Sequence, residues 1–206
     1  YLGARLFRGR DMSDFHETAP SGPTAQIAMA MQALIPVIET ERLRLRAPRI
    51  EDFDAFANAV SGPRGQYYGD YDDREGAWAD FIQLTGTWLL RGHGAWTVTD
   101  KTTHAVLGLV QIGAEPGDQE PELGFIVSQE AEGKSVAFEA AKAGRDHGFG
   151  AFQLPSLVSY VDAQNARSAA LARRLGAKRD KTAEAGFPKD DRPLVFRHQP
   201  QNRAHT

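Results

Sequence analysis

The sequence predicts an α+β domain, with a mixed, mostly antiparallel sheet of about six to seven strands flanked by about four helices. Three observations support this class. Residues 95–112 contain two strand-like runs joined by a polar turn, which is typical of an antiparallel hairpin. Residues 121–148 contain a strand, a short glycine-containing loop and a helix in unbroken succession. A chain of 206 residues, of which 41% are hydrophobic, suits a single domain with one buried core.

The chain is expected to divide into three parts. Residues 1–36 include the turn-rich stretch 19–23 and are interpreted as a flexible N-terminal extension, in which a short helix ends at Pro36. Residues 37–200 form the domain, and residues 201–206 form a C-terminal tail.

The composition excludes several functional classes. The formal net charge of −3 and the pI of about 6.1 provide no basic field for nucleic acid or an anionic membrane surface. The absence of cysteine excludes disulfides and thiolate catalysis, and the six histidines lack the spacing of a metal site. No apolar run approaches the roughly 20 residues that span a bilayer. We therefore expect a cytoplasmic monomer or homodimer without metal, nucleic-acid or membrane partners.

The first half of the domain begins with a half-buried strand, because Leu43 and Leu45 alternate with arginines. Hydrophobic residues at helical spacing then predict helices over 50–60 and 73–90. The loop 69–73 between them contains three aspartates. Two interpretations of this loop stay open: its carboxylates, with the nearby Tyr67 and Tyr68, receive a cationic substrate, or they are solvated and cap the next helix.

The rest of the domain alternates strands and helices. Strands are predicted where β-favouring residues lie between turn residues, over 95–99, 105–112, 122–127, 157–161, 177–182 and 194–198. A main helix begins near Lys134, and one of its faces contains only small residues, namely Ala137, Ala140, Ala141, Gly144 and Gly148. Such a face allows a helix to lie close to a sheet. A further helix over 165–175 ends at Gly176, the residue preferred in a left-handed cap.

The junction between the strand 122–127 and the main helix is a candidate anion site. Residues 130–135 place backbone N–H groups at a helix N-terminus, where four donors lack intrahelical acceptors and the helix dipole adds positive charge. The alternative is that Gly133 only allows the backbone to turn.

This junction, ELGFIVSQEAEGKSVAFEAA over residues 122–141, resembles the acetyl-CoA-binding segment of the GNAT acetyltransferase superfamily, whose pattern is Gln/Arg-x-x-Gly-x-Gly/Ala. It is most similar to the branch of ribosomal-protein N-terminal acetyltransferases of the RimJ and RimL type. Gly133 matches the pattern. Ser135 stands in place of the second Gly/Ala, and Glu130 stands in place of the Gln/Arg, which puts an acidic group near the expected pyrophosphate.

Two other stretches carry the same resemblance, which covers roughly residues 37–198. The segment ETERLRLR, residues 39–46, is similar to the usual N-terminal segment of the domain in this branch. Residues 162–177 resemble the family's Asn-x-x-Ser element and its Leu-Gly-Phe ending, with Ala177 in the place of Phe.

The resemblance implies an N-acetyltransferase that moves an acetyl group from acetyl-CoA to a primary amine. Because no cysteine exists to hold the acyl group, direct attack in a ternary complex is expected. The backbone of Ile126 and Val127 would pair with the pantetheine as an added strand. The full set of expected cofactor-binding residues is Ile126, Val127, Glu132, Gly133, Lys134, Ser135, Val136, Ala137 and Asn165.

Two residues are candidates for catalysis. Glu122, at the start of the central strand, is the candidate base that removes a proton from the amine, although it is alternatively a plain surface charge at a strand end. The resemblance implies that Ser168 lies near the cofactor sulfur and protonates the leaving thiolate. Asn165 would hydrogen-bond the pantetheine, and it is alternatively, or in addition, an N-cap for the N–H of residue 168.

The identity of the acceptor stays open at this point. A protein N-terminus, a polyamine-like metabolite and an aminoglycoside-like drug all contain the amine that the chemistry needs. A non-catalytic acyl-CoA-binding sensor or interaction module and an unliganded structural domain are the alternatives to an enzyme.

Overall fold

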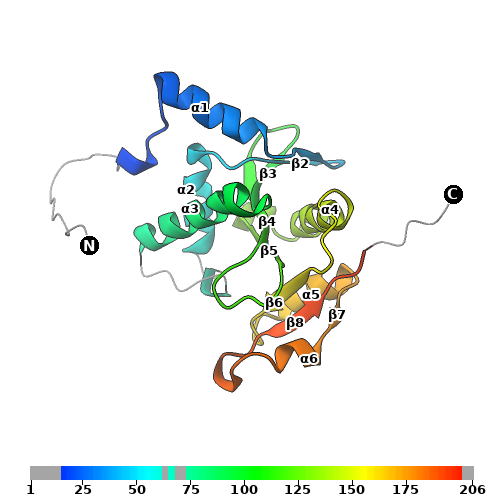
Figure 1. Ribbon diagram of the computed structural model, residues 1–206. Helices are drawn as coiled ribbons and strands as arrows, with labels where there is room; N and C mark the ends of the chain where they lie inside the picture. Colours follow the sequence, from blue (N-terminus) through cyan, green and yellow to red (C-terminus); the bar gives the residue numbers. More distant parts are fainter. Residues whose placement is uncertain (1–14, 62–64, 68–72, 201–206) are drawn as a thin grey trace, which may run out of the picture.

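The structure is a computed structural model that describes residues 15–61, 65–67 and 73–200. One eight-stranded sheet runs through this part of the chain in the order β1-β2-β3-β4-β5-β6-β8-β7 (Figure 1). Neighbouring strands are antiparallel except β5 and β6, which are parallel. The predicted α+β class with a mixed, mostly antiparallel sheet is confirmed.

The strands are β1 (Ile38–Glu39), β2 (Leu43–Arg46), β3 (Ala95–Asp100), β4 (Val106–Gly113), β5 (Glu122–Val127), β6 (Val158–Val161), β7 (Lys178–Arg179) and β8 (Leu194–Arg197). The α-helices are α1 (Gly22–Ala33), α2 (Phe53–Val60), α3 (Arg74–Arg91), α4 (Val136–Gly150), α5 (Ala166–Arg174) and α6 (Lys181–Glu184). Short 3-10 turns are η1 (Phe15–Glu17), η2 (Ile50–Asp52), η3 (Gly65–Tyr67), η4 (Gln129–Ala131) and η5 (Lys189–Asp191).

One strand and one α-helix were not expected from the sequence. The hairpin strand β1 adds one strand to the sheet, and α6 occupies the end of the predicted strand 177–182. The strand stops there because the side chain of Asp180 accepts hydrogen bonds from the N–H groups of Thr182 (3.1 Å) and Ala183 (3.0 Å). An aspartate in this arrangement starts a helix rather than continuing a strand.

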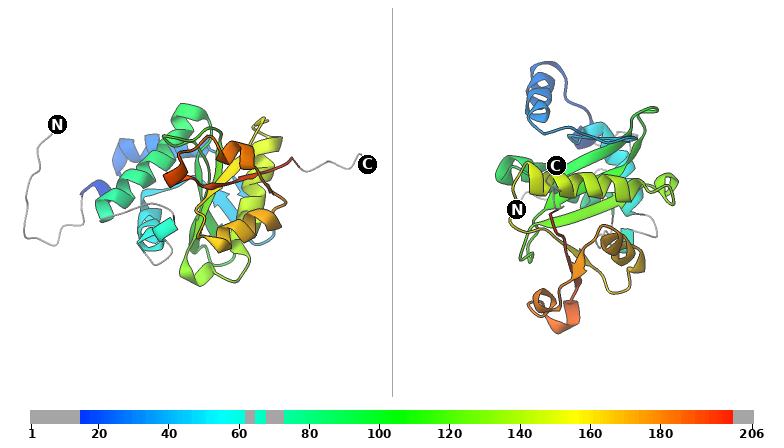
Figure 2. Two further views of the ribbon diagram at one scale, coloured as in Figure 1. Left: turned by 90° about the horizontal axis from the view of Figure 1, so that it is seen from below. Right: turned by 90° about the vertical axis from the view of Figure 1, so that its right-hand side faces the viewer.

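Helix α4 covers one face of the sheet, and α2 and α3 cover the other (Figure 2). The small-residue face of α4 lies against β4 and β5, as predicted. A Cβ built on Gly144 would come within 2.9 Å of Val110, and one built on Gly148 within 2.7 Å of Ile112. Larger residues at these two positions would therefore push the helix away from the sheet.

The opposite face of the sheet packs against aromatic residues of α2 and α3. Phe53, Phe56 and Phe81 form a buried cluster with Leu109 of β4 and Ile126 of β5. The rings of Phe53 and Phe81 lie 5.6 Å apart. Burial of this aromatic surface fixes α2 and α3 on the face that carries the side chains of the even-numbered residues of β5.

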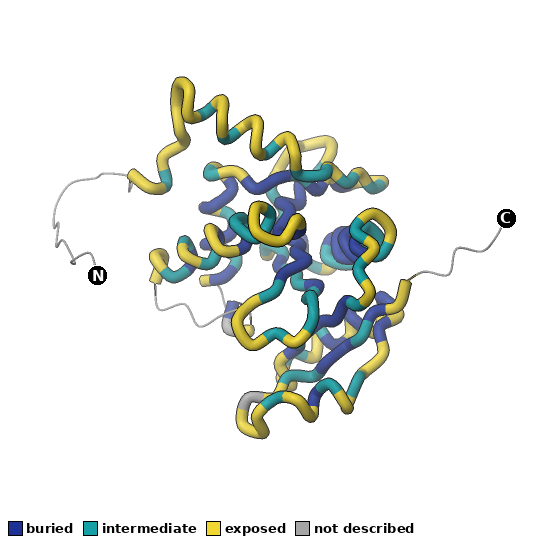
Figure 3. Tube along the Cα trace, viewed as in Figure 1, coloured by how far each residue is buried: buried dark blue, intermediate teal, exposed yellow. Residues whose placement is uncertain are grey.

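The described residues before β1 lie outside the sheet. None of the residues of α1 is buried, as Figure 3 shows. The turn η1 contacts α3: Glu17 accepts a hydrogen bond from the Arg74 guanidinium at 2.7 Å, and the ring of His16 lies 4.7 Å from that of Trp78. The assignment of residues 1–36 to a separate extension stays a prediction. No helix in the described ranges has the length and apolarity needed to cross a membrane.

Candidate active site

A cleft of about 1170 Å³ opens in the sheet where β5 and β6 separate. The two parallel strands share a single register pair, Glu122 with Val158. Strand β5, the first turn of α4, strand β6 and helix α5 line the cleft. It brings together every predicted site residue except Lys134, whose side chain is exposed and does not line it.

Where β5 and β6 separate, the side chains of Glu122 and Ser159 form hydrogen bonds in place of the backbone ladder. In a continued parallel ladder, the N–H of Tyr160 would donate to the carbonyl of Leu123. Instead, the Tyr160 N–H donates to Oε1 of Glu122 at 3.2 Å, and the buried hydroxyl of Ser159 donates to the Leu123 carbonyl at 2.7 Å. Nε2 of His198 lies 3.0 Å from the same hydroxyl. The cleft therefore opens without leaving these backbone groups unpaired.

The edge of β5 beyond this point faces the cleft. Successive residues of a strand direct their backbone groups to alternate sides, so Phe125 and Val127 face the same side as Leu123. Both line the cleft. The Ile126 carbonyl instead points toward β4, because a Cβ built on Gly108 would lie 2.1 Å from its oxygen. Sequence reasoning missed Phe125, whose backbone groups face the cleft, whereas the carbonyl of Ile126 faces β4; the period-two alternation of the strand would have identified this difference. The pairing of this strand edge with a ligand stays a prediction.

The loop that follows β5 presents free amides to the cleft. Gly133 and Ser135 both adopt left-handed backbone conformations, with φ of 68° and 61°, and α4 begins directly after them. In the described part of the chain, no protein acceptor is hydrogen-bonded to the backbone N–H groups of Val136, Ala137 or Phe138. These are the donors that a helix N-terminus leaves without intrahelical partners. The predicted anion-binding arrangement is therefore available to a ligand.

Hydrogen bonds from the β1–β2 hairpin hold this loop in place. Nη2 of Arg42 donates to the carbonyl of Lys134 at 3.1 Å, and its Nε donates to Oε2 of Glu139 at 2.8 Å. The hydroxyl of Thr40 donates to the same carboxylate at 2.5 Å. Glu139, in the first turn of α4, thus fixes the helix start to the edge of the sheet.

Two arginines of α5 face the loop across the cleft, and neither was singled out in the sequence. The Arg174 guanidinium lies 4.1 Å above the ring of Phe138, and its Nη1 is 3.4 Å from Oγ of Ser135. Arg167 lies 3.9 Å from the carboxylate of Glu132. Their spacing of two helical turns indicates a shared face. They bring positive charge to the helix terminus, whereas Glu130, at the Gln/Arg position of the pattern, is exposed on η4.

The Asn165 cap is confirmed. Oδ1 of Asn165 accepts a hydrogen bond from the Ser168 N–H at 3.0 Å and so begins α5. This bond occupies the carbonyl end of the side-chain amide and leaves its NH₂ donors to point elsewhere. Asn165 and Ser168 both line the cleft on the side opposite β5, so the cap and a ligand contact are compatible.

Glu122 is a partly buried carboxylate within the cleft and not an exposed charge at a strand end. Burial, followed by the nearby charges of Asp118 and Glu115, raises the pKa of Glu122 to about 8. The hydrogen bond from the Tyr160 N–H acts in the opposite direction. A carboxylate whose pKa lies near neutral pH is suited to accept a proton from a substrate.

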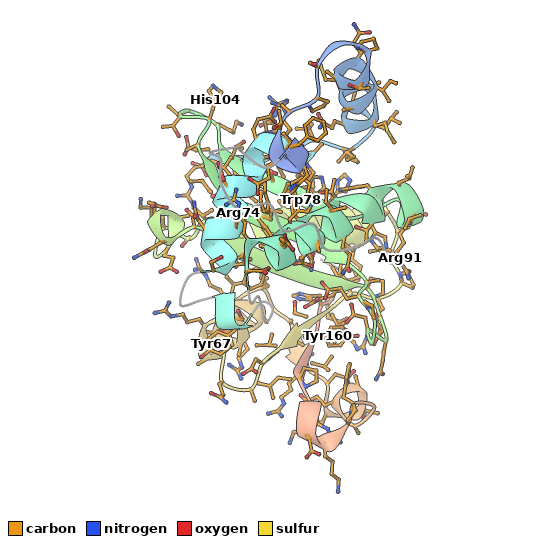
Figure 4. All side chains as sticks on the ribbon, turned by 90° about the vertical axis from the view of Figure 1, so that its left-hand side faces the viewer. Tyr67, Arg74, Trp78, Arg91, His104 and Tyr160 are labelled. Carbon is orange, nitrogen blue, oxygen red and sulfur yellow. The ribbon has the colours of Figure 1, made fainter. Side chains whose placement is uncertain are left out.

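One end of the cleft is bounded by η3 and by the loop before β5. Tyr67 of η3 lines the cleft, and Figure 4 shows Tyr67 and Tyr160 on the same side of α3. Of the acidic loop 69–73, for which two interpretations were open, residues 69–72 lie outside the described residues, as does Tyr68. The side chain of Asp73 accepts a hydrogen bond from the Gly76 N–H at 2.9 Å and caps α3, as the alternative interpretation held.

Comparison with known sequences shows the family of this chain. Residues 42–178 match the sequence model of the acetyltransferase (GNAT) domain. The chain belongs to the GNAT acetyltransferase family. Among curated proteins it is similar to YkkB of Bacillus subtilis (strain 168), an uncharacterized protein, with 30% identity over 155 residues that cover 69% of this chain and 86% of YkkB.

Solved structures of GNAT proteins have the same fold. An acetyltransferase from Agrobacterium tumefaciens str. C58 is 37% identical and superimposes with a TM-score of 0.73 over 80% of this chain and 95% of its own. The ribosomal-protein-S5-alanine acetyltransferase from Vibrio fischeri, at 18% identity and a TM-score of 0.60, covers 81% and 98%. At that identity the likeness concerns the fold alone, so the RimJ and RimL branch stays an interpretation.

Proposed function

We propose that this GNAT domain is an N-acetyltransferase that moves an acetyl group from acetyl-CoA to a primary amine. The observation that carries the proposal is the combination of two features in one cleft. One edge of β5 is unpaired along the cleft, and the backbone N–H groups at the N-terminus of α4, which follows β5, have no protein acceptor in the described part of the chain. A thioester cofactor with an amide-containing arm and a diphosphate needs these two features together.

The residues of the cleft fit acetyl-CoA. The backbone groups of Phe125 and Val127 would pair with the amides of the pantetheine arm, and the NH₂ of Asn165 would donate to it from the other wall. The amides of Val136 and Ala137 would receive the diphosphate at the end of the turn that Gly133 and Ser135 form. Arg174 would add a cationic side chain beside it, without an acidic residue bonded to its guanidinium in the described part of the chain.

The chemistry requires the amine to be neutral and the leaving sulfur to gain a proton. When acetyl-CoA is bound, it supplies an activated acyl group. Glu122 would accept a proton from the amine, whose nitrogen forms the new C–N bond as the C–S bond breaks. Ser168 would donate its hydroxyl proton to the thiolate and recover one from solvent. A backbone N–H of the β5 edge would stabilise the negative charge on the carbonyl oxygen.

A single ternary complex is the order of events that the composition favours. The whole chain contains no cysteine, so no thiolate exists to hold the acyl group between two half-reactions. Steady-state kinetics should accordingly give intersecting rather than parallel double-reciprocal lines.

The test combines a binding and a turnover measurement. Calorimetry with acetyl-CoA reports binding, and thiol release with a panel of primary amines reports transfer. Ser168→Ala and Glu122→Gln are expected to retain acetyl-CoA affinity but to lower kcat by about tenfold or more. Ser61→Ala and Glu41→Gln, at exposed positions in the turn after α2 and in the β1–β2 turn, are the matched controls. Binding without turnover for any amine would refute the enzymatic proposal and leave the sensor alternative.

A further inference from the structure

The acceptor end of the cleft contains three carboxylates from one stretch of chain. Glu115 and Asp118 belong to the loop between β4 and β5, and Glu122 begins β5. All three line the same cleft. The loop is held in place by Tyr160, whose hydroxyl accepts hydrogen bonds from the N–H groups of Gln119 and Glu120 at 3.1 Å.

These carboxylates have no cationic partner within the described residues. No lysine, arginine or histidine lies within ion-pair distance of them, although the adjacent Glu120 is paired with Arg197 at 2.6 Å. Asp80 of α3 acts on Glu115 as a further negative charge. In the part of the chain that the structure describes, no group of three such side chains is arranged to hold a metal ion. The three carboxyl groups therefore face the cleft without a cation. Burial raises the pKa of each of them, and a hydrogen bond from the Gln111 side chain acts in the opposite direction on Glu115.

A buried acceptor atom belongs to the same group of side chains, because the side chain of Gln111 is hydrogen-bonded to Glu115. Gln111 of β4 is 3% exposed and lines the cleft, and its Oε1 has no hydrogen-bond donor. The side chain lies over Gly113 and Gly124: a Cβ built on Gly124 would come within 2.8 Å of its Nε2. A buried polar atom without a partner is uncommon in a native protein, so Oε1 of Gln111 needs a donor that water or a bound molecule supplies.

The protonation state that the reaction requires limits which N–H donor can bind beside these carboxylates. The amine that attacks the acyl group must be neutral, so it cannot itself balance the carboxylates while it reacts. A second ammonium on the same molecule stays charged throughout and provides N–H donors for Gln111. Resting on the proposed function, we infer that the acceptor is a small aliphatic diamine or polyamine, whose non-reacting ammonium group is held by Glu115, Asp118 and Gln111.

The experiment compares amines that differ only in the second charge. With saturating acetyl-CoA, CoA release is measured for 1,4-diaminobutane, spermidine, butylamine and an uncharged-side-chain tripeptide. The diamine should exceed butylamine in kcat/KM by about tenfold, which corresponds to about 1.4 kcal/mol. Raising the salt concentration from about 0.05 to about 0.5 M should reduce the advantage, because part of the interaction is screened.

Variants test whether the carboxylate cluster, Glu115 and Asp118, causes the preference for the diamine. Glu115→Gln and Asp118→Asn should each lower kcat/KM for the diamine by about tenfold and change that for butylamine less than about twofold. Asn at position 118 keeps an acceptor for the Glu115 N–H, which now donates to the Asp118 carboxylate at 2.6 Å. Glu41→Gln, the same charge change on the exposed β1–β2 turn, should leave both amines unaffected. Thermal unfolding of each variant verifies that it folds.

The outcomes separate this inference from the proposed function. Equal kcat/KM for diamine and butylamine, or a tripeptide that outperforms both, overturns the polyamine assignment while leaving an N-acetyltransferase. A diamine preference that persists in both carboxylate variants overturns the role of the cluster. Absence of CoA release with every amine refutes the proposed function itself.

Discussion

Replacement of Ser135 by glycine should stabilise the protein. Ser135 directly precedes α4 with φ of 61° and ψ of 15°, a left-handed conformation that non-glycine residues adopt at a cost. Its side chain makes no capping bond to the helix. The only hydrogen bonds of its hydroxyl in the described part of the chain come from Arg174, at 3.4 and 3.5 Å. The serine therefore gains little from its hydroxyl at a position where the backbone favours glycine.

The size of the effect follows from three contributions. Relief of the left-handed conformation is worth roughly 1–2 kcal/mol. The greater freedom of glycine in the unfolded chain offsets about 0.5–1 kcal/mol. Loss of the long, exposed contact with Arg174 costs about 0.5 kcal/mol or less. Ser135→Ala keeps the strain and loses the same contact, so the glycine variant should be more stable than the alanine variant by about 1 kcal/mol.

The assay is thermal and urea unfolding of Ser135→Gly, Ser135→Ala and the parent chain. For a domain of this size, about 1 kcal/mol corresponds to roughly 2–4 °C in Tm. Gly133→Ala is the reciprocal variant, because Gly133 has φ of 68° and no atom within 4 Å of an added Cβ, so it isolates the backbone cost of about 1 kcal/mol. A glycine variant that melts at or below the alanine variant would show that the turn is unstrained.

Four further predictions concern the cleft. Ser159→Ala removes the donor to the Leu123 carbonyl and the partner of His198, and because both groups are buried we expect a loss of about 2–4 kcal/mol in unfolding free energy, measured against Ser61→Ala. The raised pKa of Glu122, to about 8, predicts that kcat increases as pH rises toward and through about 8, where the base becomes ionised, and that Glu122→Gln loses this limb of the pH profile. Because the pKa of Glu122 is higher in the folded chain than in the unfolded chain, the folded state binds the Glu122 proton more tightly. Protonated Glu122 therefore adds to the free energy of unfolding at pH 4.5 and below, and this contribution is lost as pH rises from 4.5 to about 8. Arg174→Ala should weaken acetyl-CoA binding, measured by calorimetry, by about fivefold or more and should reduce the salt dependence of that binding. Lys142 lies outside the cleft and is paired with Asp146, so Lys142→Ala should leave the affinity for acetyl-CoA unchanged.

Local elements were predictable because their signals are local. The strand Glu122–Val127 lies where its run of β-favouring residues between turn residues places it. Asn165 begins α5 because its own side chain accepts the hydrogen bond that the helix start requires. The two-residue strand β1 is too short to have a periodicity, so it escaped prediction. At Asp180 a capping side chain ends the strand after two residues.

The site was predictable in its residue types and less so in its details. The turn at Gly133 and Ser135 could be recognised, since a strand followed by glycine and a helix creates free amides wherever it occurs. Whether the backbone groups of Phe125 or those of Ile126 face the cleft depends on which edge of β5 lies beside β4. The cation–π contact of Arg174 with Phe138 joins two helices that are separated by the whole of β6.

By itself, the sequence determined the strand, the turn with its unsatisfied amides and the helix with its face of small residues, because each depends on neighbours within a few positions. Only the tertiary structure decided that β6 pairs with β5 at one position and then departs, with Ser159 and Glu122 completing the hydrogen bonds of the separated strands. It likewise decided that Gln111 lies buried beside the carboxylates. Such features arise from the register between distant segments, which is set by the packing of the whole core and not by any short stretch of residues.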